Sequence, residues 1–175
     1  MIIIIGIRIK KERKGINSAA IRVEMIYADI VSYNETSSNK IPTLEETLQL
    51  CSGRISLDIE LKESGYEESI VALAQQYFKR ENLLFTSFNR SSLELLNKFE
   101  EKVLTGFLFQ KPIRIKSIPK FVDFILPNRT LCKKWYLNKL VNIGKPIIIW
   151  TVDKSKLKKR FITENIFGLI TNDPS

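Results

Sequence analysis

The stretch that decides the fold is Arg54-Ile55-Ser56-Leu57-Asp58-Ile59-Glu60-Leu61-Lys62, in which apolar and polar residues alternate with a period of two. In a strand, this pattern places one set of side chains on each face: Ile55, Leu57, Ile59 and Leu61 on the first, and Ser56, Asp58, Glu60 and Lys62 on the second. We expect the first face to pack against a core and the second to be solvated or to carry function. Taken alone, the pattern suits a half-exposed antiparallel strand equally well.

Further short apolar or alternating runs follow this stretch, and helical patterns separate most of them. The runs are Leu83–Phe88, Leu104–Leu108, Val122–Leu126, Pro146–Val152 and Gly168–Thr171. Strands and helices that alternate in this way predict parallel strands joined by crossover helices. An open doubly wound sheet and a barrel both fit, but no glycine-rich turn opens a helix, which disfavours a nucleotide-binding sheet. Only the link between Leu108 and Val122 is too short and broken for a full helix.

Local signals mark where the helices begin and end. Thr43-Leu44-Glu45-Glu46 is a capping box, and Gly53 permits a left-handed exit from the helix that follows. Ser91-Ser92-Leu93-Glu94 repeats the capping-box pattern after a strand, and Gly144 closes the helix that carries Trp135, Leu137 and Leu140. A further helix, from about Glu67 to Phe78, places a set of apolar residues inward: Ile70, Val71, Leu73, Ala74, Tyr77 and Phe78.

The length of 175 residues, with 44% hydrophobic and 27% charged residues, is typical of one domain with its own core, spanning residues 1–175. No stretch approaches the roughly 20 apolar residues of a membrane helix, and the run Ile2–Ile5 is too short for the core of a signal peptide, so the expected location is the cytoplasm. Cys51 and Cys132 lie far apart in the chain, which favours buried reduced thiols over a disulfide or a zinc site.

The formal net charge of +9 is concentrated in two basic runs, Arg8–Lys14 and Lys154–Arg160. Such runs attract nucleic acid or an anionic membrane surface. The second run has the pattern of a helix whose lysine-rich face is solvated and whose packed side carries Leu157, Phe161 and Ile162. We therefore favour a solvated face over a nucleic-acid site.

In a barrel, the C-terminal ends of the parallel strands meet at one rim, where the active sites of that fold lie. The residues expected at this rim are Glu60, Lys62, Ser87 to Asn89, Pro127, Asn128, Trp150, Thr151, Thr171 and Asn172.

Five ordered segments of the chain resemble the landmarks of the glycerophosphodiester phosphodiesterase family. They are Ile41-Pro42-Thr43-Leu44-Glu45-Glu46-Thr47-Leu48, Leu57-Asp58-Ile59-Glu60-Leu61-Lys62, Thr86-Ser87-Phe88-Asn89, Trp150-Thr151-Val152-Asp153 and Gly168-Leu169-Ile170-Thr171-Asn172-Asp173-Pro174. The resemblance implies a TIM barrel that hydrolyses glycerophosphodiesters to glycerol 3-phosphate and an alcohol. It also implies a divalent metal, Mg or Ca, held by carboxylates, and a pair of histidines for acid and base chemistry.

By this resemblance, Glu60 matches the third metal carboxylate, Lys62 the lysine that faces the phosphate, and Trp150 the aromatic residue of the substrate pocket. The family's opening histidine-arginine-glycine strand and its second strand with a glutamate and an aspartate have no match in this chain. The next family histidine and aspartate correspond to Ile5 and Gly6, and the chain contains no histidine. Without histidines, and with only Glu60 and Asp58 as candidate metal ligands, we expect weak or no hydrolysis.

The expected fold is therefore a TIM-barrel-like (β/α) repeat that lacks roughly the first two β/α units, a partial barrel. Three outcomes are open for the exposed strand edges: a C-shaped partial barrel, closure by the strand Ile2 to Ile7, or association with a second copy or a separate N-terminal fragment. Two functions also stay open. The first is a family member whose start was lost through a late start codon, a frameshift or gene decay. The second is a non-catalytic module that binds phosphate or a lipid headgroup through Lys62 and Trp150, with the basic runs touching a membrane, or an inactive remnant.

Overall fold

The protein is described by a computed structural model that covers residues 2–7, 32, 35–36, 38, 41–99, 102–164 and 166–173. Its strands are β1 Ile2–Ile7, β2 Ser56–Leu61, β3 Leu83–Ser87, β4 Leu104–Phe109, β5 Phe124–Pro127, β6 Ile148–Ile149 and β7 Gly168–Leu169. Its α-helices are α2 Leu44–Cys51, α3 Glu67–Gln75, α4 Arg90–Leu96, α5 Lys134–Val141 and α6 Ser155–Thr163. Short 3₁₀ helices are η1 Arg80–Asn82, η2 Ile115–Ser117 and η3 Arg129–Leu131.

The strands are parallel and lie side by side in the order of the sequence. Strands β1 to β5 form one sheet, and β6 pairs with β7. Isolated bridges from Ile125 to Ile147 and from Asn128 to Trp150 connect β5 with the β6 segment. Parallel pairing is what crossover helices between successive strands impose, so the prediction of an α/β repeat rather than an antiparallel sheet is confirmed.

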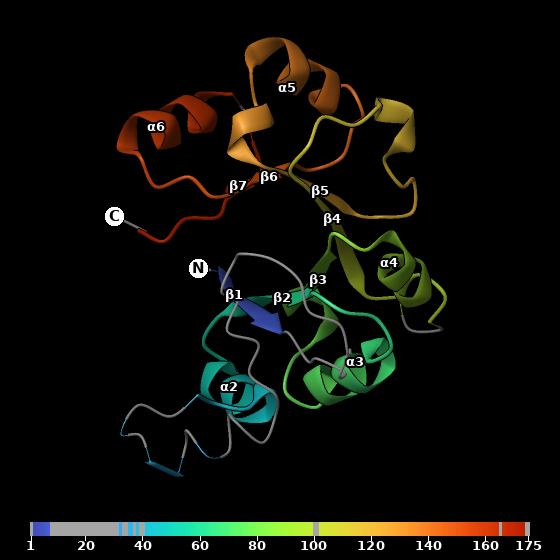
Figure 1. Cartoon of the computed structure of the whole chain (residues 1–175), viewed down its shortest axis with the longest axis vertical. Coiled ribbons are helices and arrows are strands. Elements are labelled where there is room, and N and C mark those ends of the chain that lie inside the picture. The colour runs from blue at the N-terminus through green and yellow to red at the C-terminus, as the bar shows by residue number, and fades with distance from the viewer. Residues whose placement is uncertain are drawn as a thin grey trace, which may run out of the picture.

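The strands curve into an arc, and the helices lie on its outside (Figure 1). Strand β1 extends the arc beside β2, and among the described strands no pairing joins β7 to β1. The expected C-shaped partial barrel is therefore the form that these strands adopt. Closure by the strand Ile2–Ile7 is not seen among them, and association with a second chain stays a prediction.

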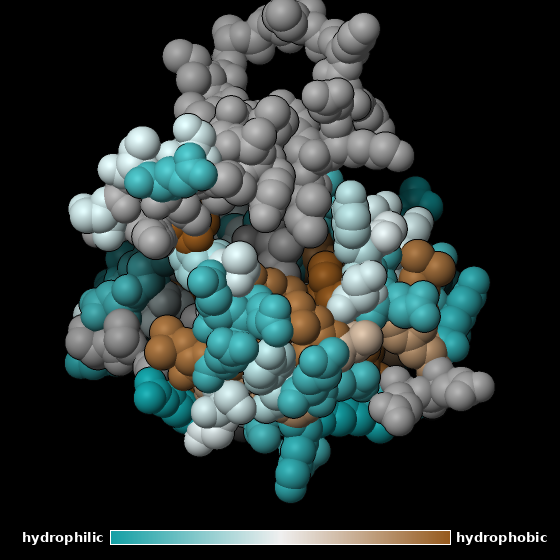
Figure 2. Space-filling model, turned by 90° about the horizontal axis from the view of Figure 1, so that it is seen from below, coloured by the Kyte–Doolittle hydropathy of each residue, from teal (hydrophilic) through white to brown (hydrophobic). Residues whose placement is uncertain are grey.

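Apolar side chains fill two layers, one on each face of the arc. The outer layer lies between strands and helices and includes Leu57, Ile59 and Leu61, as the alternation of β2 predicts. The inner layer is smaller: Leu84, Leu108, Leu126 and Ile148, with the partly buried Leu104, Phe124, Trp150 and Ile170 packed against it. On the face shown in Figure 2, apolar side chains appear as separate patches between hydrophilic ones.

Most of the predicted local signals are confirmed. At the start of α2, the backbone N–H of Glu46 donates to the Thr43 hydroxyl, and the Thr43 backbone N–H donates to the Glu46 carboxylate, which together form the capping box. Gly53 and Gly144 take positive φ angles of 71° and 77° at the ends of α2 and α5. Both cysteines are buried free thiols. In the part of the chain described, no helix combines the length and the hydrophobicity needed to cross a bilayer.

Two local predictions are wrong. The capping box at Ser91 does not form: α4 starts at Arg90, and the Asn89 side chain accepts the Ser91 N–H at 3.0 Å, because Asn89 already supplies a capping oxygen two residues earlier. Ile162 is 68% exposed instead of packed. It follows the buried Phe161 on α6 and is therefore turned by about 100° from it around the helix axis.

Candidate functional site

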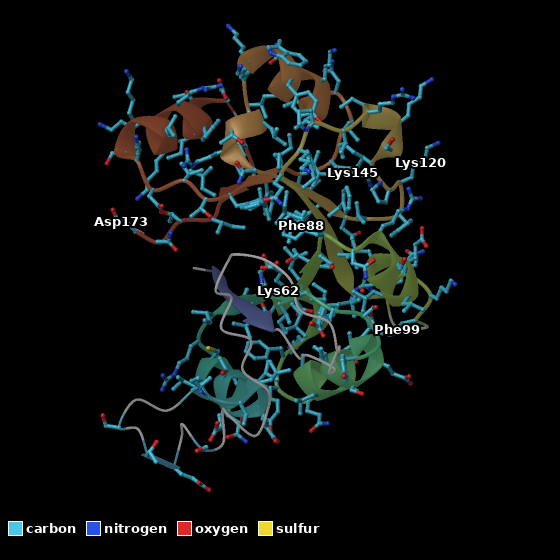
Figure 3. The ribbon with its side chains drawn as sticks, viewed as in Figure 1. Lys62, Phe88, Phe99, Lys120, Lys145 and Asp173 are labelled. Carbon is cyan, nitrogen blue, oxygen red and sulfur yellow. The ribbon has the colours of Figure 1, made fainter. Side chains whose placement is uncertain are left out.

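A pocket of about 360 Å³ opens where β2 and β3 end. Its lining residues come from two neighbouring strand ends: Glu60, Leu61 and Lys62 from β2, and Ser87, Phe88 and Asn89 from β3. Figure 3 shows Lys62 and Phe88 near each other at the middle of the arc. The C-terminal ends of parallel strands form this rim, so the structure places the pocket where the sequence predicts a site.

The predicted residues Glu60 and Lys62 lie together in this pocket. They are two positions apart in an extended segment, so both side chains point to the inner face of the arc. The Lys62 ammonium lies 2.8 Å from the Glu60 carboxylate, and the two side chains are 39% and 15% exposed. Lys62 is therefore accessible to a ligand but already contacts one anion.

Hydrogen bonds fix the backbone around the pocket. The Ser87 hydroxyl donates to the Leu61 carbonyl at 2.6 Å and accepts the Asn89 N–H at 2.9 Å. The Asn89 side chain in turn caps α4. The ends of β2 and β3 are thus connected to each other and to the following helix, which holds the residues of the pocket in a defined arrangement.

Trp150, the third predicted site residue, does not line the pocket but contacts a residue that does. Its ring meets Phe88 edge to face, with centroids 5.5 Å apart, and its indole N–H donates to the Leu126 carbonyl at 2.7 Å. Phe88 is 43% exposed and forms one wall of the pocket. The sequence places Phe88 at the rim without a role; the only signal for its role is its position directly after a buried strand.

Asp58 lies on the same inner face as Glu60 but deeper in the arc. It is 2% exposed, and its carboxylate accepts the Thr86 hydroxyl at 2.7 Å. Burial raises the pKa of Asp58 to about 7, while the Thr86 hydrogen bond lowers it and the charge of Glu60 raises it further. Asp58 therefore titrates near neutral pH although it does not line the pocket.

The described residues do not fit a divalent metal site. Among them, no three aspartate, glutamate, histidine or cysteine side chains lie close enough to hold an ion. The register places Gly6 beside Glu60 and Ile4 beside Asp58, and neither residue type supplies a metal ligand. Glu60 contacts Lys62, and a lysine ammonium repels a cation. Among the described residues, the charged groups of the pocket are thus one ion pair, Lys62 with Glu60, and not a set of metal ligands.

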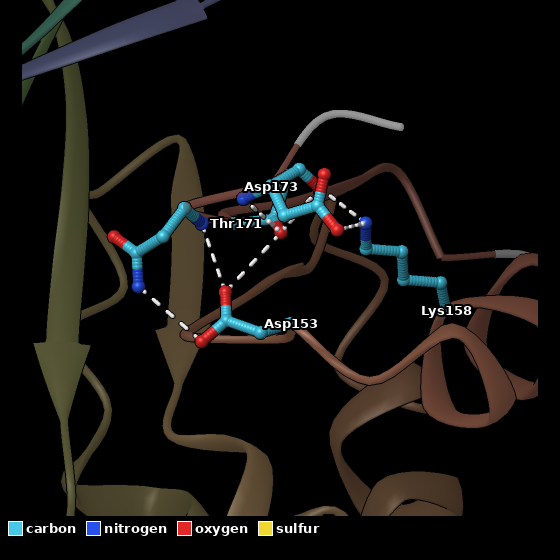
Figure 4. Close-up of polar contacts among 5 residues, drawn as sticks. Asp153, Lys158, Thr171 and Asp173 are labelled. Carbon is cyan, nitrogen blue, oxygen red and sulfur yellow. Dashed lines mark hydrogen bonds and ion pairs between the residues drawn. The ribbon is translucent and has the colours of Figure 1, made fainter.

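A second cluster of polar contacts lies farther along the rim, after β6 and β7 (Figure 4). The Asp153 carboxylate accepts the Asn172 backbone N–H at 2.8 Å and the Thr171 hydroxyl at 3.3 Å. These contacts, the Asn172 backbone N–H first, lower the pKa of Asp153. Lys158 of α6 contacts both the backbone carbonyl and the carboxylate of Asp173. The predicted rim residues Thr171 and Asn172 thus hold the segment after β7 in place.

Comparison with known proteins gives several relatives. A glycerophosphodiester phosphodiesterase of Caldanaerobacter subterraneus subsp. tengcongensis is 27% identical over 169 residues, which cover 87% of this chain and 66% of that protein. A glycerophosphodiester phosphodiesterase of Bacillus altitudinis is 30% identical over 154 residues, which cover 81% of this chain and 63% of the relative. An uncharacterized protein of Mycoplasma genitalium is 29% identical over 146 residues. No family model matches the chain.

Solved structures show the same fold. A phosphodiesterase of Oleispira antarctica, in complex with the product sn-glycerol-3-phosphate, has a TM-score of 0.65 at 18% identity and covers 75% of this chain and 57% of that one. A glycerophosphodiester phosphodiesterase of Parabacteroides distasonis has a TM-score of 0.62 at 19% identity, and the match covers 80% of this chain and 66% of that one. The chain spans 66% and 63% of the length of the two named curated relatives.

Proposed function

Because the chain belongs to the glycerophosphodiester phosphodiesterase family, we propose that its rim pocket recognises the phosphate of a glycerophosphodiester. The observation that carries this proposal is the Lys62 side chain, which is 39% exposed and lines a pocket together with Phe88. An ammonium has three N–H donors, so one can remain on Glu60 while the others face phosphate oxygens. Phe88 then offers an apolar wall to the carbon atoms beside the phosphate. The Oleispira antarctica relative with bound sn-glycerol-3-phosphate supports this class of ligand.

We also propose that this chain alone hydrolyses glycerophosphodiesters weakly or not at all. The sequence contains no histidine, and general acid and base catalysis typically contribute about 10²- to 10⁴-fold each. Asp58 has a pKa of about 7, but it is 2% exposed and so cannot reach a leaving alkoxide in the pocket. Lys62 is positioned to bind a phosphate. The pocket, as described, then has no suitable group to transfer a proton to the leaving alkoxide.

The hydrolysis prediction is tested with purified protein, glycerophosphocholine and either magnesium or calcium. We expect no release of glycerol 3-phosphate above a blank without protein. The Caldanaerobacter relative, assayed in parallel, serves as the positive control for substrate and metal. Clear turnover by this chain would refute the proposed loss of catalysis.

The binding prediction is tested by replacing Lys62. We expect Lys62→Ala to weaken binding of glycerophosphocholine by about 10- to 100-fold, because a hydrogen bond to a charged group contributes about 1.5–3 kcal/mol. Isothermal titration calorimetry measures the affinity. Lys79→Ala, at an exposed lysine outside the pocket, is the matched control and should bind as the unchanged protein does. Equal affinities of both variants would contradict the assignment of Lys62.

A non-catalytic module that binds phosphate or a lipid headgroup is the second candidate, favoured by the contact between Lys62 and Glu60 in place of a carboxylate cluster. Binding without turnover supports the module, and neither binding nor turnover supports an inactive remnant. Mg or Ca as cofactor stays an expectation for the family, because the described residues of this chain do not supply its ligands. A second copy or separate N-terminal fragment as partner remains part of the proposal. Gel filtration tests the partner. A cytoplasmic location also stays a prediction, which cell fractionation tests.

A further inference from the structure

Positive charge is strongly concentrated in one part of the chain. Residues 129–164 contain ten of the 28 lysines and arginines and only two acidic residues, Asp153 and Glu164. This segment therefore carries +8 of the total charge of +9. It includes α5 and α6, which lie next to each other on the outside of the arc (Figure 1).

A specific contact connects α6 with the segment just before α5. The Arg160 guanidinium donates to the Cys132 carbonyl at 2.7 Å and pairs with Glu164 at 3.1 Å. Exposed lysines lie on both of these neighbouring helices and just before α5, and we call this set the basic face: Lys133, Lys134, Lys139, Lys156 and Lys159. Figure 3 shows nitrogen-tipped side chains projecting outward from both helices.

The two acidic residues of the segment do not neutralise the basic face. Glu164 forms an ion pair with Arg160, and the Asp153 carboxylate accepts a hydrogen bond from Asn172, after β7. Within the described residues, none of the five lysines of the basic face forms an ion pair. Their charge is therefore available to an anionic partner.

Large apolar side chains are exposed on the same two helices. Trp135 is 60% exposed, Val141 47% and Ile162 68%. The Lys139 ammonium lies 5.2 Å from the centroid of the Trp135 ring, so an exposed aromatic ring and a cation form one unit. Tryptophan is enriched at membrane interfaces, where its ring contacts acyl chains and its N–H contacts the headgroups.

We propose that the basic face docks this chain on the surface of an anionic phospholipid bilayer, with the lysines at the headgroup phosphates and Trp135 in the interface. Each lysine near such a surface contributes about 1 kcal/mol, or about fivefold in affinity. A bilayer fits better than a single-stranded nucleic acid, because base stacking uses successive aromatic rings. Trp135 is the one exposed aromatic residue on α5 and α6 as described, whereas Val141 and Ile162 are aliphatic.

Docking through the basic face leaves the pocket free. The pocket lies at the ends of β2 and β3, across the arc from α5 and α6 (Figure 1). None of its lining residues belongs to the basic face. The inference therefore does not depend on what the pocket binds, and the two can be tested separately.

Cosedimentation with vesicles tests the electrostatic part. We expect binding to vesicles of phosphatidylcholine with phosphatidylglycerol, loss of binding at high salt, and no binding to pure phosphatidylcholine. The double variant Lys134→Gln/Lys159→Gln should bind about 25-fold more weakly. The control Lys79→Gln/Lys116→Gln removes the same charge from exposed sites elsewhere and should lose much less. No binding to the anionic vesicles, or equal losses in both double variants, would overturn the proposal.

Fluorescence tests the role of Trp135. In a Trp150→Phe background, Trp135 is the remaining tryptophan, and its emission should shift to shorter wavelength when anionic vesicles are added. Trp135→Ala should weaken vesicle binding and leave the melting temperature nearly unchanged, because the side chain is 60% exposed. An unshifted emission would overturn the interfacial placement. Binding to polyuridylate in place of vesicles would assign the face to nucleic acid.

Discussion

The polar face of β2 shows how much a residue pattern determines. The period of two correctly places Asp58, Glu60 and Lys62 on one face, but it says nothing of depth along the arc. Asp58 is buried against Thr86, whereas Glu60 and Lys62 reach the pocket two and four positions later. Depth depends on how neighbouring strands are staggered, which no single strand's sequence contains.

The raised pKa of Asp58 predicts how the stability of the protein depends on pH. The unfolded chain binds this proton with a pKa of about 3.9, and the folded chain with a pKa of about 7. Between these values the unfolded state loses its proton while the folded state keeps it, so stability falls as the pH rises, by about 4 kcal/mol in total. Above both values the penalty is constant.

Asp58→Asn removes this titration and can still accept the Thr86 hydroxyl. We expect its free energy of unfolding to exceed that of the unchanged protein by an amount that grows between pH 4 and pH 7, of the order of a few kcal/mol. Urea denaturation across this pH range measures the difference. Parallel stability curves for the two proteins would contradict the raised pKa.

At the scale of elements, β4 contains a glycine that the inner layer requires. A Cβ atom on Gly106 would lie 2.5 Å from Leu126 Cδ1 and 2.9 Å from Thr86 Cγ2. Both neighbours are fully or almost fully buried, at 0% and 1% exposed, and Thr86 is held by Asp58. At Gly106 the inner layer is therefore packed too closely for a Cβ atom unless Leu126 and Thr86 move.

Gly106→Ala should destabilise the protein by about 1–3 kcal/mol through overpacking. Gly168→Ala in β7 is the matched control, since its Cβ would lie 3.7 Å from Ile148, an ordinary contact distance. The control should be neutral or slightly stabilising, because alanine loses less backbone entropy on folding than glycine does. Thermal or urea unfolding compares the two, and an equal effect at both sites would show that the inner layer tolerates a methyl group at β4.

The elements also show which signals are local. The capping box at Thr43 and the turns at Gly53 and Gly144 are predicted correctly because they depend on residues within one helical turn. Strands β6 and β7 are only two residues long, Ile148–Ile149 and Gly168–Leu169, and are shorter than their apolar runs suggest. Their length is set by the pairing partner rather than by their own residues.

For the whole molecule, the order of strands follows from the sequence, but the site only partly does. Glu60 and Lys62 are predicted together because they follow one strand with a period of two. The contact between Phe88 and Trp150 joins the ends of β3 and β6, which are 62 positions apart in the numbering. Such a contact depends on the curvature of the arc, so the sequence could place Phe88 and Trp150 at the rim but could not predict that their rings meet.

The central claim is that this chain binds a glycerophosphodiester at the rim pocket, and an NMR titration of the isotope-labelled protein with glycerophosphocholine tests it most directly. The account predicts that the amide signals of Lys62, Phe88 and Asn89 shift together and saturate, and that those of α5 and α6 stay in place. Saturating shifts confined to other residues, or no shifts at high ligand concentration, would contradict it.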